Sequence, residues 1–300
     1  MKYSQLLTAI LICVLIAAGS LAAQDGLALM KVETGARPAG MGGAFGAIAG
    51  SAEAAAYNPA GAYGIEKFSA SFGHISYWEN IRLETGYFAF AASSRLVVHG
   101  GLKYAAIDDL ERRGLVPSED PLAVFDAHDA SFKAGAAYRV TDRITAGGAM
   151  GWYFEKIDAW SGWAFNIDLG VNAMAMEHLT VGASVTGLGS DLTLSQSTRN
   201  SSRPIPLPTT WRVGAAYGYN RLVAAADFVY LDESAHAHLG AEFVAHELFQ
   251  VRTGYMAGYD TKNFSAGASF VQRNLTVDYA FVPYTKDLGT VHMINFTLMM

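Results

Sequence analysis

From Lys67 to the end of the chain, apolar residues alternate with polar or small ones at a period of two. In the stretch 130–140, Phe132 and Tyr138 belong to an apolar row, while Lys133 and Arg139 belong to the row between them. This alternation is typical of a β-strand with one apolar and one wet face. The same scheme returns at 144–155, 162–175 and 179–188, so the chain is predicted to fold as successive antiparallel hairpins.

The composition decides which kind of β-protein this is. Hydrophobic residues make up 51% of the chain and charged residues only 16%, with a mean hydropathy of +0.19. After residue 23, however, no uninterrupted apolar run reaches the roughly 20 residues of a spanning helix. The pattern therefore predicts an all-β transmembrane barrel, whose apolar surface occupies every second residue. A soluble β-sandwich is the alternative, but it would need a second polar surface.

We expect about fourteen strands of roughly ten residues, the length that a tilted strand needs to cross a bilayer. An even number places both termini on one side, the periplasm, together with short turns such as Glu177-His178 and Asn220-Arg221. Two longer connections, Asp108 to His128 and Gly189 to Pro208, should face the outside of the cell. The expected strands are 67–78, 81–92, 95–107, 129–140, 144–155, 162–175, 179–188, 209–219, 222–231, 235–245, 248–256, 263–272, 275–283 and 289–300.

Residues 1–23 have the pattern of a cleaved signal peptide. Lys2 supplies the positive start, Leu6 to Ala18 the apolar centre, and small residues near Ala22 the cleavage site. Cys13 is the only cysteine in the sequence and would be removed with this segment. The mature protein is then expected to be an exported chain without disulfides, located in the cell outer membrane.

Residues 24–66 break the alternation and are predicted to form a compact plug ahead of the barrel, 67–300. Its glycine-rich half runs from Gly35 to Gly50, and Ser51 is a candidate N-cap for a short Ala-rich helix. That helix should end near Asn58, because a residue before proline avoids the α region and Pro59 has no N–H to donate.

The segment AGMGGAFGAIAGSAEAAAYNPAG, from Ala39 to Gly61, closely resembles the N-terminal signature of the PorV/PorQ outer-membrane proteins. These are relatives of the FadL-like transporters of hydrophobic compounds, and Asn58 to Gly61 is the most specific part. The resemblance implies two functions. One is a component or accessory of type IX protein secretion, with secretion proteins or secreted cargo as partners. The other is passive transport of a fatty acid or another hydrophobic ligand.

The two functions make different demands on the plug and the outer connections. Transport predicts that plug residues line a ligand path, whereas secretion predicts a partner-binding surface on the two long connections. The candidate path residues are Met41, Gly42, Gly43, Phe45, Ile48, Tyr57, Asn58 and Pro59.

Charged residues are expected to face the barrel interior, because they cannot face lipid cheaply. A hydrated interior that braces the plug is favoured over a selective passage. The predicted lumenal set is Arg82, Glu84, Lys103, Asp168, Arg212, Asp227, His236, His238, Glu242 and Asp278.

Other functions find little support in the sequence. His236 and His238 share a face, yet strand residues two apart are widely spaced for a metal site, and metal-free lumenal histidines are favoured. No G-x-S-x-G elbow or P-loop is present, so we expect neither an enzyme nor a cofactor. The net charge of -6 disfavours a nucleic-acid partner.

Overall fold

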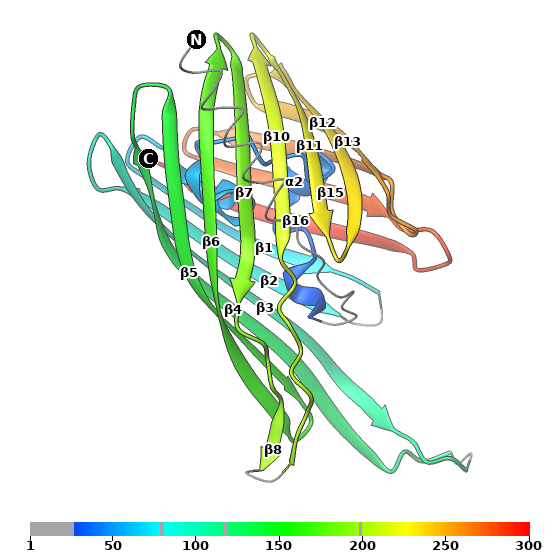
Figure 1. Ribbon diagram of the computed structural model, residues 1–300. Coiled ribbons are helices and arrows are strands. Elements are labelled where there is room, and N and C mark those ends of the chain that lie inside the picture. Colours follow the sequence, from blue (N-terminus) through cyan, green and yellow to red (C-terminus); the bar gives the residue numbers. More distant parts are fainter. Residues whose placement is uncertain (1–26, 79–80, 117–118, 198–199) are drawn as a thin grey trace.

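The computed structural model describes residues 27–78, 81–116, 119–197 and 200–300. The expected signal peptide, 1–23, lies outside the described residues. The chain forms an all-β, closed antiparallel barrel of fourteen strands in this described part (Figure 1). The barrel closes because β1 pairs with both β2 and β16: Phe72 lies opposite Gly86 on one side and opposite Phe296 on the other. The predicted fold is confirmed.

The strands match the expected segments closely at their centres and differ mainly in length. Every barrel strand pairs with its sequence neighbours, except that β7 pairs with β10 across a long connection. The barrel strands are β1 (Phe68–Ser76), β2 (Arg82–Ala91), β3 (Leu96–Arg112), β4 (Ala123–Arg139), β5 (Ile144–Ile157), β6 (Trp160–Met176), β7 (Leu179–Gly189), β10 (Thr210–Tyr219), β11 (Leu222–Leu231), β12 (Ser234–His246), β13 (Phe249–Ala257), β14 (Phe264–Gln272), β15 (Leu275–Pro283) and β16 (Thr290–Met299).

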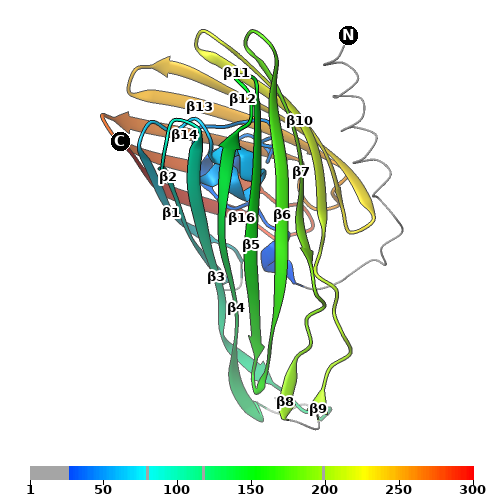
Figure 2. The same ribbon diagram turned by 60° about the vertical axis from the view of Figure 1, so that its left-hand side comes forward.

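The two ends of the barrel differ. The end that carries Met300 has short connections such as Glu177-His178 and is called the turn end. At the opposite end, called the loop end, β3, β4 and β6 reach 17 residues each, and these strands together with β5 extend beyond the remaining barrel strands (Figures 1 and 2). The small strands β8 (Ser195–Ser197) and β9 (Asn200–Ser201) lie on the same side.

The connections correct part of the sequence prediction. Most of Asp108 to His128 is strand, because β3 and β4 stay paired out to Arg112 and Ala123 past an irregularity between Ile107 and Leu110. The loop end also holds tight turns. Two residues separate β5 from β6 and β11 from β12, and Asp158 and Asp232 there take positive φ values of 56° and 50°.

The outer wall of the barrel is apolar. Phe72, Phe132 and Phe296 point outward and are 65%, 53% and 53% exposed. Their strand neighbours Ser71, Ser131 and Thr297 point inward and are buried. This is the alternation of a lipid-facing barrel, with large apolar side chains outside and small polar ones inside.

Residues 27–66 lie inside the barrel and are called the plug (Figures 1 and 2). They form one short α-helix and three short 3-10 helices: η1 (Ala28–Met30), α2 (Ala36–Gly40), η2 (Glu53–Ala56) and η3 (Pro59–Ala62). Within the described ranges, no helix has the length and hydropathy needed to span a membrane.

The predicted Ala-rich helix exists only as the single turn η2. Ser51 does not cap it: Ala52 occupies the N-cap, and the Ser51 hydroxyl is buried without a partner in the described structure. Asn58 instead begins the next helix, η3, where its side chain accepts a hydrogen bond from the Ala60 N–H at 3.0 Å. A run of alanines has helix propensity, but Pro59 leaves it too little length to propagate.

Candidate functional site

The plug is seated against inward-facing glycines of the barrel wall. A side chain at Gly254 would collide with the backbone of Met41 and Gly42, and one at Gly182 with that of Gly46. The plug backbone therefore occupies the space that wall side chains would otherwise fill. This glycine belt consists of Gly147, Gly170, Gly182, Gly240, Gly254 and Gly267, on β5, β6, β7, β12, β13 and β14.

Two polar side chains fix the middle of the plug. The Asn58 Nδ2 donates to Gly46 O and to Asn172 Oδ1, both at 2.8 Å, which ties the plug to itself and to β6. On the other side, Asp227 Oδ2 accepts hydrogen bonds from the N–H groups of Phe45 and Gly46 at 2.9 and 2.8 Å. Asn58 thus anchors this part of the plug to β6, which gives the Asn-Pro element a structural role.

A row of buried ion pairs continues around the same level. Arg212 pairs with Asp227 at 2.8 Å and also donates to Gly43 O at 2.8 Å. Farther along, Arg37 of the plug meets Glu242 with two hydrogen bonds of 2.9 Å, a planar two-point contact. Arg212, Asp227 and Glu242 of the predicted lumenal set thus face the lumen and contact the plug.

The pKa of Arg37 reflects this contact. Burial by itself lowers the pKa of the guanidinium, but the facing carboxylate of Glu242 outweighs burial, and the net pKa is raised. Arg37 therefore stays charged, and Glu242 in turn contacts Arg252 at 2.5 Å. The row ends with Arg252 and Asp278 at 2.9 Å.

Glu53 of the plug differs from Glu242, because no cationic side chain among the described residues is in hydrogen-bond contact with it. It accepts hydrogen bonds from the Ser71 hydroxyl and, at 3.1 Å, from Asn295 Nδ2. Burial, and next the negative charge of Asp278, raise the pKa of Glu53 to about 7.

The first described segment of the plug, 27–34, reaches the loop end and is held there by charge. Lys31 pairs with Asp232 at 2.5 Å, and Glu33 pairs with Lys262 of the β13–β14 connection. Burial alone would raise the pKa of Glu33, but Lys262 reverses this effect and the pKa is lowered. The plug thus spans the lumen from the loop end toward the turn end.

The lining of the lumen changes along the barrel axis. Near the loop end the inward side chains are apolar, as on β16, where Val291 and Met293 come first. Toward the turn end the same strand presents Asn295 and Thr297. The buried apolar group of the loop-end half, called the outer apolar cluster, includes Leu27, Leu29, Ile75, Leu83, Leu192, Leu207, Met256, Val282, Val291 and Met293.

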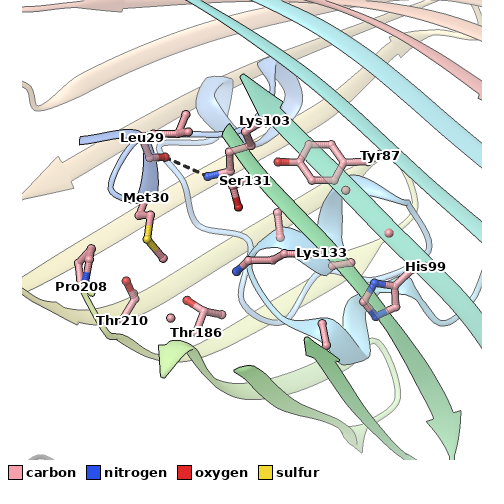
Figure 3. A pocket seen from close by; sticks show the side chains of 16 residues that line it. Leu29, Met30, Tyr87, His99, Lys103, Ser131, Lys133, Thr186, Pro208 and Thr210 are labelled. Atoms are coloured by element: carbon pink, nitrogen blue, oxygen red, sulfur yellow. Dashed lines mark hydrogen bonds between the residues drawn. The ribbon is translucent and has the colours of Figure 1, made fainter. Parts of the chain in front are cut away.

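Two cavities lie between the plug and the wall. One, of about 50 Å³, is bordered by plug residues such as Leu29 and Met30 and by Tyr87, His99 and Lys103 of β2 and β3 (Figure 3). We call it the Lys103 cavity. The neighbouring one, of about 70 Å³, shares Met30 and Lys103 with it and extends to Glu33, Arg212 and His238.

A third space of about 170 Å³ lies on the turn-end side of the plug. Its lining includes Arg37, Glu53, Glu242, Arg252 and Asp278. It shares no lining residue with the first two cavities. The plug therefore separates this charged space from the first two cavities.

The apolar residues proposed as a ligand path have another position. Met41, Phe45 and Ile48 pack with Tyr57 in a closed buried cluster, in which Met41 and Phe45 are fully buried. Of the eight candidates, Gly43 and Tyr57 border a cavity. Gly42 and Pro59 lie against glycines of the belt. In this closed arrangement, the core of the plug fills the centre of the lumen, and the cavities lie at its sides.

Arg82 and Glu84 were predicted to face the lumen, and this prediction is wrong. Both side chains point outward on β2, where the inward row is Leu83, Thr85 and Tyr87. Glu84 pairs with His74 at 2.7 Å and Arg82 with Asp108, all four half-exposed. They tolerate the outer face because they lie near the loop end of β2, where outward groups meet water and head groups.

The remaining predicted charges lie inward. Asp168 pairs with Lys133. His236 stacks on Tyr259 with ring centroids 3.9 Å apart, and His238 Nε2 lies 2.9 Å from the Tyr259 hydroxyl. No group of three or more metal-ligating side chains occurs within the described residues. Sequence reasoning missed the glycine belt, although strand glycines spaced on the inward row are a readable signal of close backbone approach.

Known structures share this architecture. The Ralstonia pickettii toluene transporter TbuX is 16% identical, with a TM-score of 0.63, over 89% of this chain and 99% of that one. The P. putida toluene transporter TodX is 11% identical, with a TM-score of 0.60, over 89% and 99%. A Pseudomonas aeruginosa FadL homologue is 12% identical, with a TM-score of 0.58, over 93% and 100%.

These similarities establish the fold, which is a FadL-like β-barrel. No protein-family profile matches the sequence, and no curated protein matches it significantly.

Proposed function

We propose that this protein is an outer-membrane channel for hydrophobic small molecules, working by passive diffusion. The observation that carries the proposal is the outer apolar cluster, which lies at the loop end of the lumen next to a plug held by ion pairs. Apolar walls lower the free energy of an apolar ligand relative to water by roughly 25 cal/mol per Å² of buried surface. The architecture is shared with two proteins described as toluene transporters, which supports the same class of ligand.

The proposed direction is from the cell surface to the periplasm. With both barrel termini on the periplasmic side, the loop end faces outward, and the ligand meets the outer apolar cluster first. The closed core of Met41, Phe45 and Tyr57 then requires the plug to shift before the ligand leaves. Transport would therefore be gated by plug movement.

Uptake measurements test the proposal. Cells that produce the protein in the outer membrane, in a host without related channels, should take up labelled toluene faster than cells with an empty vector, whereas uptake of arabinose should not change. Met293→Gln, which places an amide in the outer apolar cluster, should lower toluene uptake. Met293→Leu is the matched control and should retain it. Equal toluene uptake with and without the protein would contradict the proposal.

A role in type IX secretion, as a PorV/PorQ-type protein, is a second proposal. It is favoured by one observation: the β3–β4 hairpin projects from the loop end and exposes apolar side chains near its tip, with Leu115, Val116 and Leu122 at 106%, 78% and 71% exposure. Exposed apolar groups of this kind often mark protein contacts.

Shortening this hairpin tests the second proposal. Replacing Arg112 to Ala123 by a two-residue turn should leave the barrel folded but abolish co-purification of secretion proteins or cargo from the native outer membrane. If the full-length protein captures no such partner, the secretion proposal fails. Toluene uptake by the shortened barrel provides the control for its integrity.

A further inference from the structure

The apolar outer wall of the barrel has a hollow at Gly86. Strand pairing places Gly86 directly between Phe72 of β1 and Leu102 of β3. Both of these side chains point outward and are exposed, and Phe296 of β16 continues the same level. Gly86 has no side chain to fill its place in this level. The resulting hollow has a volume of about 340 Å³, and Ile294 lines it together with these residues.

Packing within the wall does not require a glycine at this position. A Cβ on Gly86 would lie 3.7 Å from the ring of Phe72, which is an ordinary contact, and the φ value of Gly86 is not in the left-handed range. The pairing of β2 with β1 and β3 passes through Gly86 without a bulge. A glycine inside a regular strand costs stability and often marks a place that a ligand approaches closely. The described part of the chain gives no other reason for it.

The hollow is a depression in the wall and not an opening through it. Residues 82–90 of β2 are paired with β1 and residues 82–91 with β3, without interruption. The neighbours of Gly86 in the chain, Thr85 and Tyr87, are buried on the inner side. The hollow shares no lining residue with the three cavities beside the plug. It is therefore separate from the proposed transport route.

Charged and polar groups border the hollow on its loop-end side. His74 Nδ1 lies 2.7 Å from Glu84 Oε1, and both residues line the hollow. Arg82, two residues closer to the loop end of β2, pairs with Asp108. In the other direction, the next outward residue of β2 is Phe88. The hollow thus lies where the apolar wall ends, at the depth where the head groups of a bilayer meet its acyl chains.

These two pairs leave polar groups for a further contact. The pair with Asp108 uses Arg82 Nη2, and the pair with Glu84 uses His74 Nδ1. The other guanidinium N–H groups of Arg82 and Nε2 of His74 have no partner within the described ranges of the chain. A guanidinium is well suited to a phosphate, which it can contact through two parallel N–H groups.

From these observations we propose that the hollow binds one phosphate-bearing lipid of the surrounding membrane. An acyl chain lies over Gly86 between Phe72 and Leu102, and the phosphate contacts Arg82 and His74. The occupant is a lipid and not a water-soluble molecule, because the hollow opens sideways, into the layer that the apolar outer wall faces. The inference concerns the outer wall and does not depend on the proposed transport function.

Native mass spectrometry of the full-length barrel, extracted from the membrane in mild detergent, tests the acyl-chain contact. Wild type should retain a single lipid. Gly86→Phe fills the hollow and should lower retention roughly tenfold, because losing the burial of about two methylene groups has this effect on affinity. Gly148→Phe is the matched control and should retain the lipid. Gly148 also points outward, and an added Cβ there would lie 3.6 Å from its nearest neighbour, Leu169.

The head-group contact is tested with two added lipids that have the same acyl chains. Phosphatidylglycerol should bind to the delipidated wild-type barrel several-fold more tightly than diacylglycerol, which lacks the phosphate. Arg82→Gln should remove this preference. Arg143→Gln, at an exposed turn, is the control and should keep it. Equal binding of both lipids to wild type would overturn the assignment of a phosphate-bearing lipid.

Several other results would also overturn the proposal. These are a wild-type barrel that retains no lipid, equal retention by wild type and Gly86→Phe, and a dimer that Gly86→Phe dissociates, since the hollow would then be an interface between two copies. Heat-modifiable gel mobility verifies that each variant is folded, and Gly86→Leu takes the place of Gly86→Phe if the larger side chain prevents folding. Toluene uptake should be the same in Gly86→Phe and wild type, so failure of this inference is distinguishable from failure of the transport proposal.

Discussion

At Gly42 and Gly43 the plug backbone takes φ values of +63° and +71°, which side-chain-bearing residues rarely adopt. A Cβ on Gly43 would also lie 2.9 Å from His238 Nδ1, and one on Gly42 would lie 3.0 Å from Tyr255 N. Steric constraints therefore explain the two successive glycines at positions 42 and 43. Neither position has room for a branched side chain.

We expect Gly42→Val and Gly43→Val each to impair barrel assembly. Strain and clash together should cost about 2 to 4 kcal/mol, because a β-branched residue in this region is strained before any contact is counted. The folded fraction can be measured by heat-modifiable gel mobility. Gly148→Val is the control, since Gly148 points outward and an added Cβ there would be 3.6 Å from its nearest neighbour, Leu169. Unchanged folding of the plug variants would contradict this account.

Glu53 predicts a pH dependence of stability. Its pKa is raised to about 7 in the folded protein from an ordinary 4.5, with burial as the main cause and Asp278 as the next. The folded state thus holds the proton more tightly than the unfolded state. Its stabilising contribution is fully present below about pH 4.5, declines as the pH rises and is lost above about pH 7.

The measurement is the free energy of unfolding as a function of pH. Wild type should lose up to about 3 kcal/mol between pH 4.5 and 7 through this group, at about 1.4 kcal/mol per pKa unit. Glu53→Gln, which cannot ionise, should remove that part of the slope. Glu177→Gln, on an exposed turn, should follow the wild-type curve. An identical slope in wild type and Glu53→Gln would show that another group titrates.

Among the elements, the positions of the strands were predictable from the sequence, whereas the conformation of the plug was not. Alternation fixes which face of a strand is buried, because a shift by one residue moves every apolar side chain to the wrong side. Arg82 and Glu84 were misplaced because a charge near a strand end can face outward at low cost. The plug has no period: its conformation depends on contacts such as Asn58 with Asn172, which lie far apart in the sequence.

The α2 helix is expected to depend on its ion pair with the barrel. Arg37→Met would leave the buried Glu242 with Arg252 as its one remaining cationic partner among the described residues, at a cost of about 3 kcal/mol. Amide hydrogen exchange should accelerate in the plug segment 36–48 while the strands remain protected. Arg143→Met, at an exposed turn, is the matched control. Equal protection of the plug in both variants would mean that the glycine belt alone holds α2.

At the scale of the whole molecule, apolar inward side chains near the loop end give way to ion pairs at the level of the plug. The inward residues of β11 follow this order, since Leu231 and Val229 at the loop end give way to Asp227 beside the plug. Under the proposed transport function, an apolar ligand would be stabilised near the loop end and would then meet desolvated ion pairs at the plug. Its release would require contacts between the plug and the wall to break.

A reversible lock tests whether the plug must move. Ser69 Oγ on β1 lies 3.3 Å from the Ala52 N–H in the plug, so we expect the pair Ala52→Cys and Ser69→Cys to come within reach of a disulfide. Because Cys13 is the only native cysteine and belongs to the expected signal peptide, no other disulfide should compete. Oxidised cells should take up toluene several-fold more slowly than the same cells after reduction, and each single-cysteine variant should be indifferent to oxidation. Equal uptake in both states would place the route beside a stationary plug, along the Lys103 cavity.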